Sequence, residues 1–424
     1  MGPVKVRTLL GLGLALMASG CDSCGSKPTA PTSDAKASAA PTASSPPFTG
    51  AAPDLSLPIG ADIGPDGSAI FVAGLVAASR TIVLSHYDAK GTLVGVTDAF
   101  SDVDWVSGVE LRVYVGTSGI AVAYRGPIAK TNGHHVRLFD PSGKPRGDAF
   151  DVDGVPCVEK DALITMDHGV GKIATHPLGG AAAVLGLASV PDAMLACGDA
   201  KAYLLDEGDD GLAVRGIEET ATKNVAAGDG DDEPREHPAY TVGDELSLVI
   251  VTTGGTMKVV APFDATPREV GKLHDDEDIV AVDGDAKRTF VVYSKDDLTR
   301  CGSEGLVSDV FVRVFPRDGS KTTSEEVIKA ACDTDVGPFW TGEAGGKTVI
   351  AWGERSSKRP AGAPPVTALG YHVLGEPGVQ HVTLSAEDVV FADCAGAKCW
   401  AATIERPTGT DGMAPGKARL VSFP

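Results

Sequence analysis

The fold is decided by a pattern first met in Val83-Leu84-Ser85-His86-Tyr87-Asp88-Ala89-Lys90-Gly91 and again in Val136-Arg137-Leu138-Phe139-Asp140-Pro141-Ser142-Gly143. Each stretch is a short run rich in β-branched, aliphatic and aromatic residues, and each ends in a turn that contains Asp, Gly or Pro. Such runs predict β-strands bounded by turns. Long periodic helical stretches are missing from the chain, so the sequence predicts an all-β protein.

The same strand-and-turn unit recurs through the chain. The last large residues before the turns are Tyr87, Phe139, Leu205, Phe263, Phe315, Val373 and Phe423, with gaps of 50 to 66 residues. A further strand precedes each copy, although the third copy is blurred within 169–190, so each unit holds about four short strands. Four strands per unit at this period predict a β-propeller. The count favours seven blades, with six or eight as the alternatives.

The end of the chain predicts how the ring closes. The last unit stops after its third strand at Phe423, which would leave an unpaired sheet edge. Asp54-Leu55-Ser56-Leu57-Pro58 alternates apolar and polar residues, and we expect it to supply the missing strand beside the C-terminus. One local exception is expected. Residues Thr323 to Ala331 read as a short helix, with Glu326 three residues after Thr323 as in a capping box.

One turn carries a resemblance to known propellers. The run Gly64-Pro65-Asp66-Gly67-Ser68-Ala69-Ile70-Phe71-Val72 is similar to the Pro-Asp-Gly turn of propeller repeats such as those of the Tol-system propeller. Asp283-Gly284-Asp285 is a looser echo of it. The resemblance supports the fold and implies no function, because a fold hosts many functions.

The N-terminus reads as an export signal. Lys5 and Arg7 precede an apolar run of 11 residues over 8–18, and Ala18-Ser19-Gly20 then lead into Cys21. The run is too short to span a bilayer as a helix. The small residues before the cysteine resemble the lipobox of bacterial lipoproteins, although Ala18 stands where that family usually has Leu. The resemblance implies that residues 1–20 are removed and that Cys21 carries the lipid. The alternative is an ordinary signal peptide followed by a chance cysteine.

A tether follows the proposed anchor. Of the 29 residues from Asp22 to Gly50, 23 are Ser, Ala, Pro, Thr or Gly, and Phe48 is the only large apolar residue. Such a segment cannot bury enough surface to offset its ordering entropy. We therefore expect three regions: a signal peptide over 1–20, a disordered tether over 21–50 and a propeller over 51–424. Localisation is expected to be extracytoplasmic, on the bacterial cell envelope and thus periplasmic or at the surface, with inner and outer membrane both left open.

The charge balance excludes two classes of partner. The chain has 37 Lys and Arg against 57 Asp and Glu, a formal charge of −20, and removing Lys5 and Arg7 takes it to −22. Binding to a nucleic-acid backbone or to anionic lipid headgroups needs clustered cations. Neither nucleic acid nor a polybasic membrane contact is expected. Aromatic residues make up 5% of the chain, so the core must consist mainly of Val, Ile, Leu and Ala.

The eight cysteines divide into three groups. Cys21 is assigned to the lipid, and Cys24 lies in the tether without an evident partner. The other six allow 15 pairings. Proximity in the predicted units favours three disulfides: Cys157 with Cys197, Cys301 with Cys332, and Cys394 with Cys399. Metal binding by the pair at 394 and 399 is the less favoured alternative, since zinc would need two more ligands.

Several motifs suggest chemistry without meeting its requirements. Residues Gly342 to Thr348 resemble a phosphate-binding loop, but the spacing is one residue short and a strand follows, so we expect a turn. Acidic clusters at 206–210, 229–233 and 275–278 depart from the alternating calcium loop. They are interpreted as solvated turns, with a calcium site as the alternative.

The histidines and tryptophans are interpreted as structural. His134-His135 opens a strand and is interpreted as an ordinary surface or strand-edge pair, with a ligand pair as the alternative. Asp167-His168 lies near an expected inner strand, where propellers often bind ligands. Trp105, Trp340 and Trp352 fit blade packing better than a sugar platform. Neither a nucleophile elbow nor a pair of histidines at helical metal spacing is present in the sequence. No catalytic residue, metal or cofactor is therefore predicted.

Two classes of function remain. The first is a lipid-anchored scaffold that binds a protein or an envelope polymer through one face of the propeller. The second is a propeller enzyme, a hydrolase, lyase or cofactor-dependent dehydrogenase acting at the channel mouth. The sequence favours binding, because no catalytic set is recognised. A pocket that gathers several His, Asp or Arg side chains would favour the enzyme.

Overall fold

The computed structural model describes residues 51–424 outside a set of short gaps. The gaps are residues 105–108, 129–130, 153–155, 160, 168–171, 181–182, 186–193, 198–201, 209–210, 218–222, 226–233, 237–238, 243–244, 253–254, 261–267, 274–276, 285–286, 298, 302–306, 317, 333, 357–365, 386 and 406–414. The predictions about Cys21, Cys24, Trp105, His168 and Phe263 lie outside the described residues. Within the described part there are 32 strands, and no helix capable of crossing a membrane is found.

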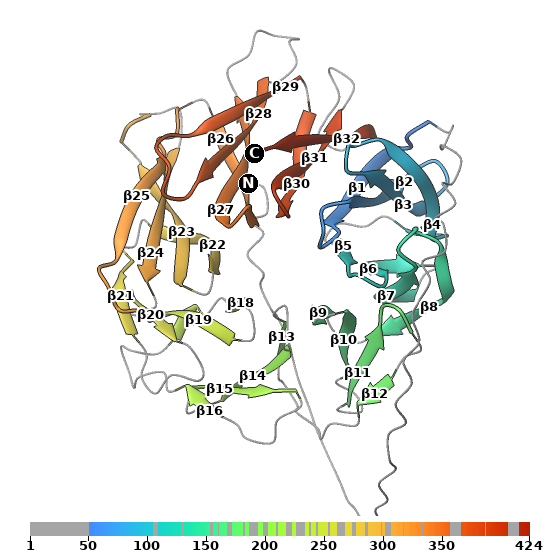
Figure 1. The fold of residues 1–424 in the computed structure, drawn as a ribbon, viewed down its shortest axis with the longest axis horizontal. Helices are drawn as coiled ribbons and strands as arrows, with labels where there is room; N and C mark the ends of the chain where they lie inside the picture. The colour runs from blue at the N-terminus through green and yellow to red at the C-terminus, as the bar shows by residue number, and fades with distance from the viewer. Residues whose placement is uncertain are drawn as a thin grey trace, which may run out of the picture.

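The strands form seven sheets around a ring, which confirms the prediction of an all-β propeller (Figure 1). Three four-stranded sheets and one five-stranded sheet follow one another in the middle of the chain. Their strands are β5 (Glu110–Val115), β6 (Ile120–Ile128), β7 (Thr131–Phe139) and β8 (Pro145–Val152); β9 (Cys157–Glu159), β10 (Ala162–Asp167), β11 (Lys172–Pro177) and β12 (Ala183–Leu185); β13 (Met194–Cys197), β14 (Ala202–Gly208), β15 (Gly211–Gly216) and β16 (Lys223–Val225); and β17 (Pro234–Glu236), β18 (Ala239–Val242), β19 (Glu245–Thr252), β20 (Thr256–Val260) and β21 (Arg268–Lys272).

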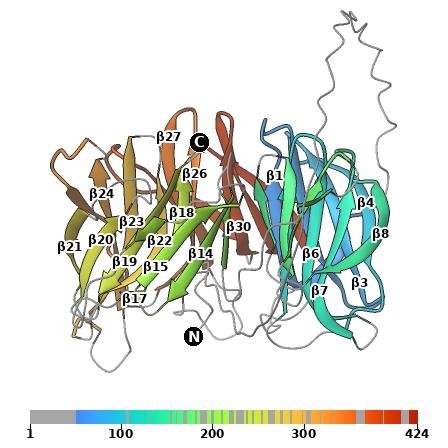
Figure 2. The ribbon, with the colours of Figure 1, turned by 90° about the horizontal axis from the view of Figure 1, so that it is seen from below.

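Two more four-stranded sheets and one seven-stranded sheet complete the ring. The four-stranded sheets consist of β22 (Glu277–Gly284), β23 (Arg288–Asp297), β24 (Val307–Pro316) and β25 (Thr323–Ile328), and of β26 (Thr334–Ala344), β27 (Lys347–Ser356), β28 (Val366–Val373) and β29 (Gln380–Ser385). The seven-stranded sheet has the order β30 (Glu387–Ala395), β31 (Lys398–Glu405), β32 (Gly416–Phe423), β1 (Asp54–Ile63), β2 (Ala69–Val76), β3 (Thr81–Asp88) and β4 (Leu93–Phe100). Seen from below, the sheets stand side by side, with their strands running between two faces of the ring (Figure 2).

The first strands of neighbouring sheets contact one another toward the middle of the ring. Such contacts join β1 with β5, β9 with β13, β13 with β18, β18 with β22, β22 with β26, and β26 with β30. Within a sheet, consecutive strands pair antiparallel through short connections, except that β17 and β18 both pair with β19. Each sheet thus extends outward from an inner strand, which is the first strand except in the five-stranded sheet, where β18 makes the contacts, and this arrangement defines a propeller blade.

The ring closes through β1, as the sequence predicts. Asp54 pairs with Lys417 and Leu55 with Gly416, so the start of β1 lies beside the C-terminal strand β32. From Ile59 to Ile63 the same strand pairs with β2. One strand therefore continues the last sheet and begins the first, which leaves neither β32 nor β2 with an open edge on that side.

The prediction of the third unit is wrong, both in the number of sheets it covers and in the strand that holds its last large residue. Two separate sheets, β9–β12 and β13–β16, lie where the sequence pattern indicates a single unit. Leu205 lies in β14, the second strand of its sheet, whereas Tyr87 and Phe139 lie in third strands. The strands here are short, with three residues each in β9, β12 and β16. Runs of three residues carry too little periodicity to be recognised in a sequence.

The helix predicted over 323–331 is also wrong. Thr323 to Ile328 form strand β25, which pairs with β24 from Val314 back to Val310. Its first four residues are exposed and Val327 and Ile328 are buried, as suits the outer strand of a blade. Pairing with β24 and burial of these two β-branched residues outweigh the helical preference of the glutamates.

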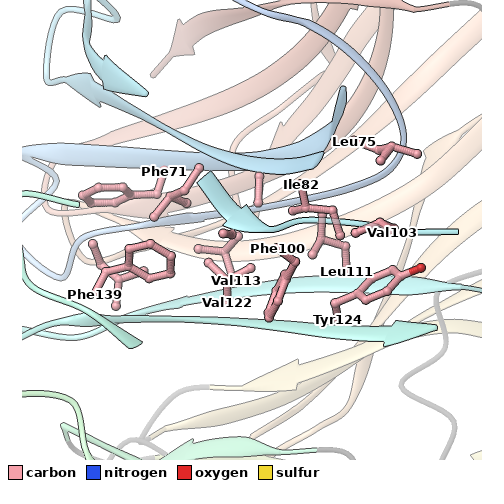
Figure 3. Packing of buried hydrophobic residues seen from close by; sticks show 14 residues of the cluster. Phe71, Leu75, Ile82, Phe100, Val103, Leu111, Val113, Val122, Tyr124 and Phe139 are labelled. Atoms are coloured by element: carbon pink, nitrogen blue, oxygen red, sulfur yellow. The ribbon is translucent and has the colours of Figure 1, made fainter. Parts of the chain in front are cut away.

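Hydrophobic cores fill the spaces between neighbouring sheets. In the largest, Phe71, Ile82 and Phe100 from the first blade face Val122 and Tyr124 from β6 (Figure 3). All five side chains are at most 3% exposed. Trp352 is fully buried in another such cluster and packs near Phe339, which confirms its structural role.

The three predicted disulfides are present. Cys301–Cys332 and Cys394–Cys399 join segments within or beside one sheet, and Cys394 lies directly opposite Cys399 in the β30–β31 hairpin. Cys157–Cys197 links β9 to β13, the first strands of two neighbouring sheets. The prediction for this last pair is correct in the two cysteines that it joins. It is wrong in placing them in one unit, because they belong to two neighbouring sheets.

Candidate functional site

The loop that resembles a phosphate-binding motif is a hairpin turn, as predicted. Ala344 pairs with Lys347 at the end of β26 and the start of β27. Gly345 and Gly346 between them have φ of 57° and 76°, values that favour glycine. No helix follows, so this segment cannot direct helical amides toward a phosphate.

The described residues of the acidic clusters form no metal site. Glu277 and Asp278 belong to β22 and Asp206 to β14, whereas 229–233 lie outside the described residues. Across the described ranges, no group of three or more His, Cys, Asp or Glu side chains could hold a metal ion. Asp167 is the last residue of β10, where it pairs with Lys172, and it does not line the hollow beside His135.

One surface hollow does gather polar side chains, and it lies beside His135. It has a volume of about 320 Å³ and is bounded by the end of β4, the end of β6 and the middle of β7 and β8. The lining residues are Ala99, Phe100, Ser101, Ile128, His135, Arg137, Ala149 and Asp151. This volume is at the lower end of the range for small-molecule sites.

Alternation along the two strands brings the polar groups together. His135 and Arg137 are two residues apart on β7, and Ala149 and Asp151 are two apart on β8, so each pair shares one face. His135 lies directly opposite Asp151 in the antiparallel register. The imidazole and the carboxylate are therefore neighbours across the strands.

A bulge in β8 opens the space beside Arg137. Val136 pairs with Phe150 and Leu138 pairs with Arg146, so β8 has extra residues between these two pairs. Gly147 lies in this bulge with φ of 69°, and nothing lies within 4 Å of the position where its Cβ would be. Bulges break the regular pairing and redirect side chains, and they recur beside functional sites.

The His135 ring is held at both nitrogens. Nδ1 lies 2.7 Å from Asp151 Oδ1 and Nε2 lies 3.0 Å from the carbonyl oxygen of Gly126. The ring is 5% exposed, whereas the Asp151 side chain is 71% exposed. Both ring nitrogens are therefore engaged by oxygen atoms of the protein. A ring held in this way has no free lone pair with which to act as a general base.

Arg137 connects the hollow to the neighbouring blade. Its Nη1 donates to the carbonyl oxygen of Ala99 at 3.0 Å and more weakly to that of Asp98 at 3.5 Å. Its Nε is buried and has no hydrogen-bond partner. Among the described side chains no carboxylate forms an ion pair with this guanidinium. An arginine held by carbonyl oxygens keeps its positive charge uncompensated and can bind an anion.

Sequence reasoning treats His135 as a structural residue and does not single out Arg137 or Asp151. His135 was expected to be an ordinary surface or strand-edge residue, yet it is buried and paired across the sheet. The spacing of His135 and Arg137 on one strand was visible in the sequence. The pairing with Asp151, however, depends on the register of β7 against β8, and the bulge that sets this register carries no strong sequence signal.

No protein-family model and no curated protein matches the chain. Among solved structures, the chain is similar to a prolyl endopeptidase (10% identity, 83% of this chain, TM-score 0.48), to the dihydro-heme d1 dehydrogenase NirN (11%, 77%, 0.47) and to the WD40 domain of SCAP from fission yeast (10%, 88%, 0.45). The chain spans 55% of the endopeptidase chain, 66% of the dehydrogenase chain and 96% of the WD40 domain. Sequence identities this low say nothing of function. The arrangement of the sheets makes the chain a β-propeller protein.

Proposed function

We propose that this chain is a lipid-anchored extracytoplasmic binding protein whose propeller binds a protein or an envelope polymer. The observation that carries the proposal is the state of the polar groups in the hollow beside His135. Both ring nitrogens of His135 are engaged, one by Asp151 Oδ1 and one by the carbonyl oxygen of Gly126, so the ring offers no free base to a substrate. Such an arrangement suits binding better than catalysis.

The N-terminal sequence supports the same role. A lipid on Cys21 would fix the chain to the membrane, and the segment 22–50 would act as a flexible tether. A tethered propeller can search for a partner held elsewhere in the envelope. With a charge of −22 after processing, it would favour partners that carry basic patches.

We infer in addition that the ring has eight blades. The seven-stranded sheet contains two four-stranded units, because β1–β4 form one and β30–β32 with the start of β1 form another. Six further sheets follow from β5 to β29. An experimental structure that places seven inner strands around the axis instead of eight would overturn this count.

The experiment that tests the function is crosslinking of the lipidated protein in native membranes, followed by purification and mass spectrometry. One stoichiometric partner is expected, and its recovery should fall at high salt because charge steers the association. A matched sample of Cys21→Ser should lose the partner through loss of the anchor. Absence of a partner, together with turnover of a sugar or ester panel by the purified protein, would contradict the proposal.

A further inference from the structure

We propose that the hollow beside Arg137 binds a small carboxylate with a short apolar body, either a free acid or the C-terminal residue of a peptide. The site is the one lined by β4, β6, β7 and β8. The proposal rests on the same hollow as the function proposed above, and it is tested with small probes, so its failure is distinguishable from the absence of a macromolecular partner.

The charge in the hollow favours an anion. The Asp151 carboxylate is engaged by His135, whose Nδ1 lies 2.7 Å from Asp151 Oδ1. Arg137 supplies a positive charge in a protein whose total charge is −20, and among the described residues no carboxylate forms an ion pair with it. A guanidinium without an ion-pair partner favours an anionic ligand at this position.

The chemistry of the guanidinium suits an oxyanion such as a carboxylate. Arg137 uses Nη1 to bind Ala99, and its buried Nε has no partner. A buried donor without a partner costs free energy, which a ligand oxygen would recover. A planar guanidinium matches the two oxygens of a carboxylate better than a point charge would.

The remaining wall is apolar and limits the size of the ligand. Phe100 is 3% exposed and belongs to the core between the first two blades, so the wall it provides is rigid (Figure 3). Ala99, Ile128 and Ala149 complete this wall. A volume of about 320 Å³ has room for a carboxylate and one branched aliphatic group. The lining therefore predicts a ligand such as a branched short-chain acid or a C-terminal leucine.

The test is titration of the lipidated full-length protein in nanodiscs, followed by saturation-transfer NMR. The probes are isovalerate and N-acetyl-leucine, with isovaleramide and N-acetyl-leucinamide as uncharged controls of the same shape. Binding of both acids and of neither amide is expected. Binding of isovalerate without binding of N-acetyl-leucine would indicate a free acid as the ligand. Tighter binding of a tripeptide ending in leucine than of its C-terminal amide would indicate a peptide terminus. Equal binding of acids and amides, or no binding by either acid, would overturn the proposal.

Three variants connect the binding to this hollow. Arg137→Gln should weaken isovalerate at least tenfold, because it removes the charge, whereas Lys144→Gln removes an exposed charge from the loop before β8 and should leave binding unchanged. Ala149→Leu fills the hollow from an exposed position, so it should abolish binding without disturbing the core. Unchanged affinity in Ala149→Leu, measured on protein with the wild-type melting temperature, would place the ligand elsewhere and refute the assignment.

Discussion

Leu55 packs directly on Gly74, and this contact joins the two ends of the ring. A Cβ placed on Gly74 would lie only 3.0 to 3.3 Å from the side-chain carbons of Leu55. The backbone of Leu55 meanwhile pairs with Gly416 in the C-terminal strand. Leu55 is fully buried, in a cluster that also contains Trp400 and Ile404. One side chain therefore connects the first blade to the last.

Leu55→Ala should destabilise the fold by about 2–5 kcal/mol, the range for removing a buried leucine from a packed core. Urea unfolding followed by circular dichroism measures this loss. Val94→Ala is the matched control, because Val94 is 40% exposed and its loss should change stability by less than about 0.5 kcal/mol.

Two N-terminal deletions test closure by β1. Deletion of 22–48 should be neutral, whereas deletion of 22–58 should lower Tm and expose a sheet edge. Equal stability of the two deletions would contradict closure by β1.

Gly370→Ala should destabilise the protein through Trp352. A Cβ at Gly370 would overlap the indole ring, which is fully buried and donates from Nε1 to Glu354 at 2.7 Å. Overpacking of this kind typically costs about 1–3 kcal/mol. Gly95→Ala is the control, since nothing lies within 4 Å of its Cβ position. Thermal unfolding with Trp fluorescence as the signal distinguishes the two, and equal Tm values would show that the indole can move aside.

The disulfides should differ in their contribution to stability. Cys157–Cys197 and Cys301–Cys332 close loops with sequence separations of 40 and 31, and Cys394–Cys399 closes one of 5. In the entropic account the first two contribute about 4 kcal/mol each and the third about 2 kcal/mol. Paired Cys→Ser variants, compared by calorimetry, should follow this order. Peptide mapping without reductant that finds free thiols at these six positions would refute the pairing itself.

Stability should fall in alkali, partly through Tyr87. Burial raises the pKa of the Tyr87 hydroxyl to about 12, above the value near 10 of an unfolded chain. Between these values the unfolded state releases the proton and the folded state retains it. Stability is thus complete below pH 10 and is lost as the pH rises toward 12. Tyr87→Phe removes the buried hydroxyl that titrates, so it should flatten this alkaline loss. A Tm profile from pH 7 to 11 that is identical in the two proteins would contradict the assignment.

The accuracy of the sequence predictions follows the length of the strands. Long runs such as Val83–Tyr87 carry their own alternation, so the all-β class, the propeller and the closure by Asp54–Pro58 could be predicted. The short strands of β9–β16 could not be counted, because three residues have no measurable period. The hollow depends on two distant facts, the register of β7 against β8 and the approach of Arg137 to Ala99 of another blade. Neither leaves a local pattern in the sequence.

The lipid anchor gives the last prediction, which concerns residues outside the described part of the chain. Cys21 follows Ala18-Ser19-Gly20, and Cys24 lies three residues further on, so the chain contains its own matched control. Metabolic labelling with a palmitate analogue should mark the wild type and Cys24→Ser equally. Cys21→Ser should lose both the label and the membrane fraction, because an apolar run of 11 residues cannot hold the protein in a bilayer as a helix. Acyl chains add about 0.8 kcal/mol of membrane affinity per buried methylene, so loss of the lipid on Cys21 should remove most of the membrane affinity. Label that persists in Cys21→Ser and disappears in Cys24→Ser would move the anchor to the second cysteine, and label that persists in both would eliminate it.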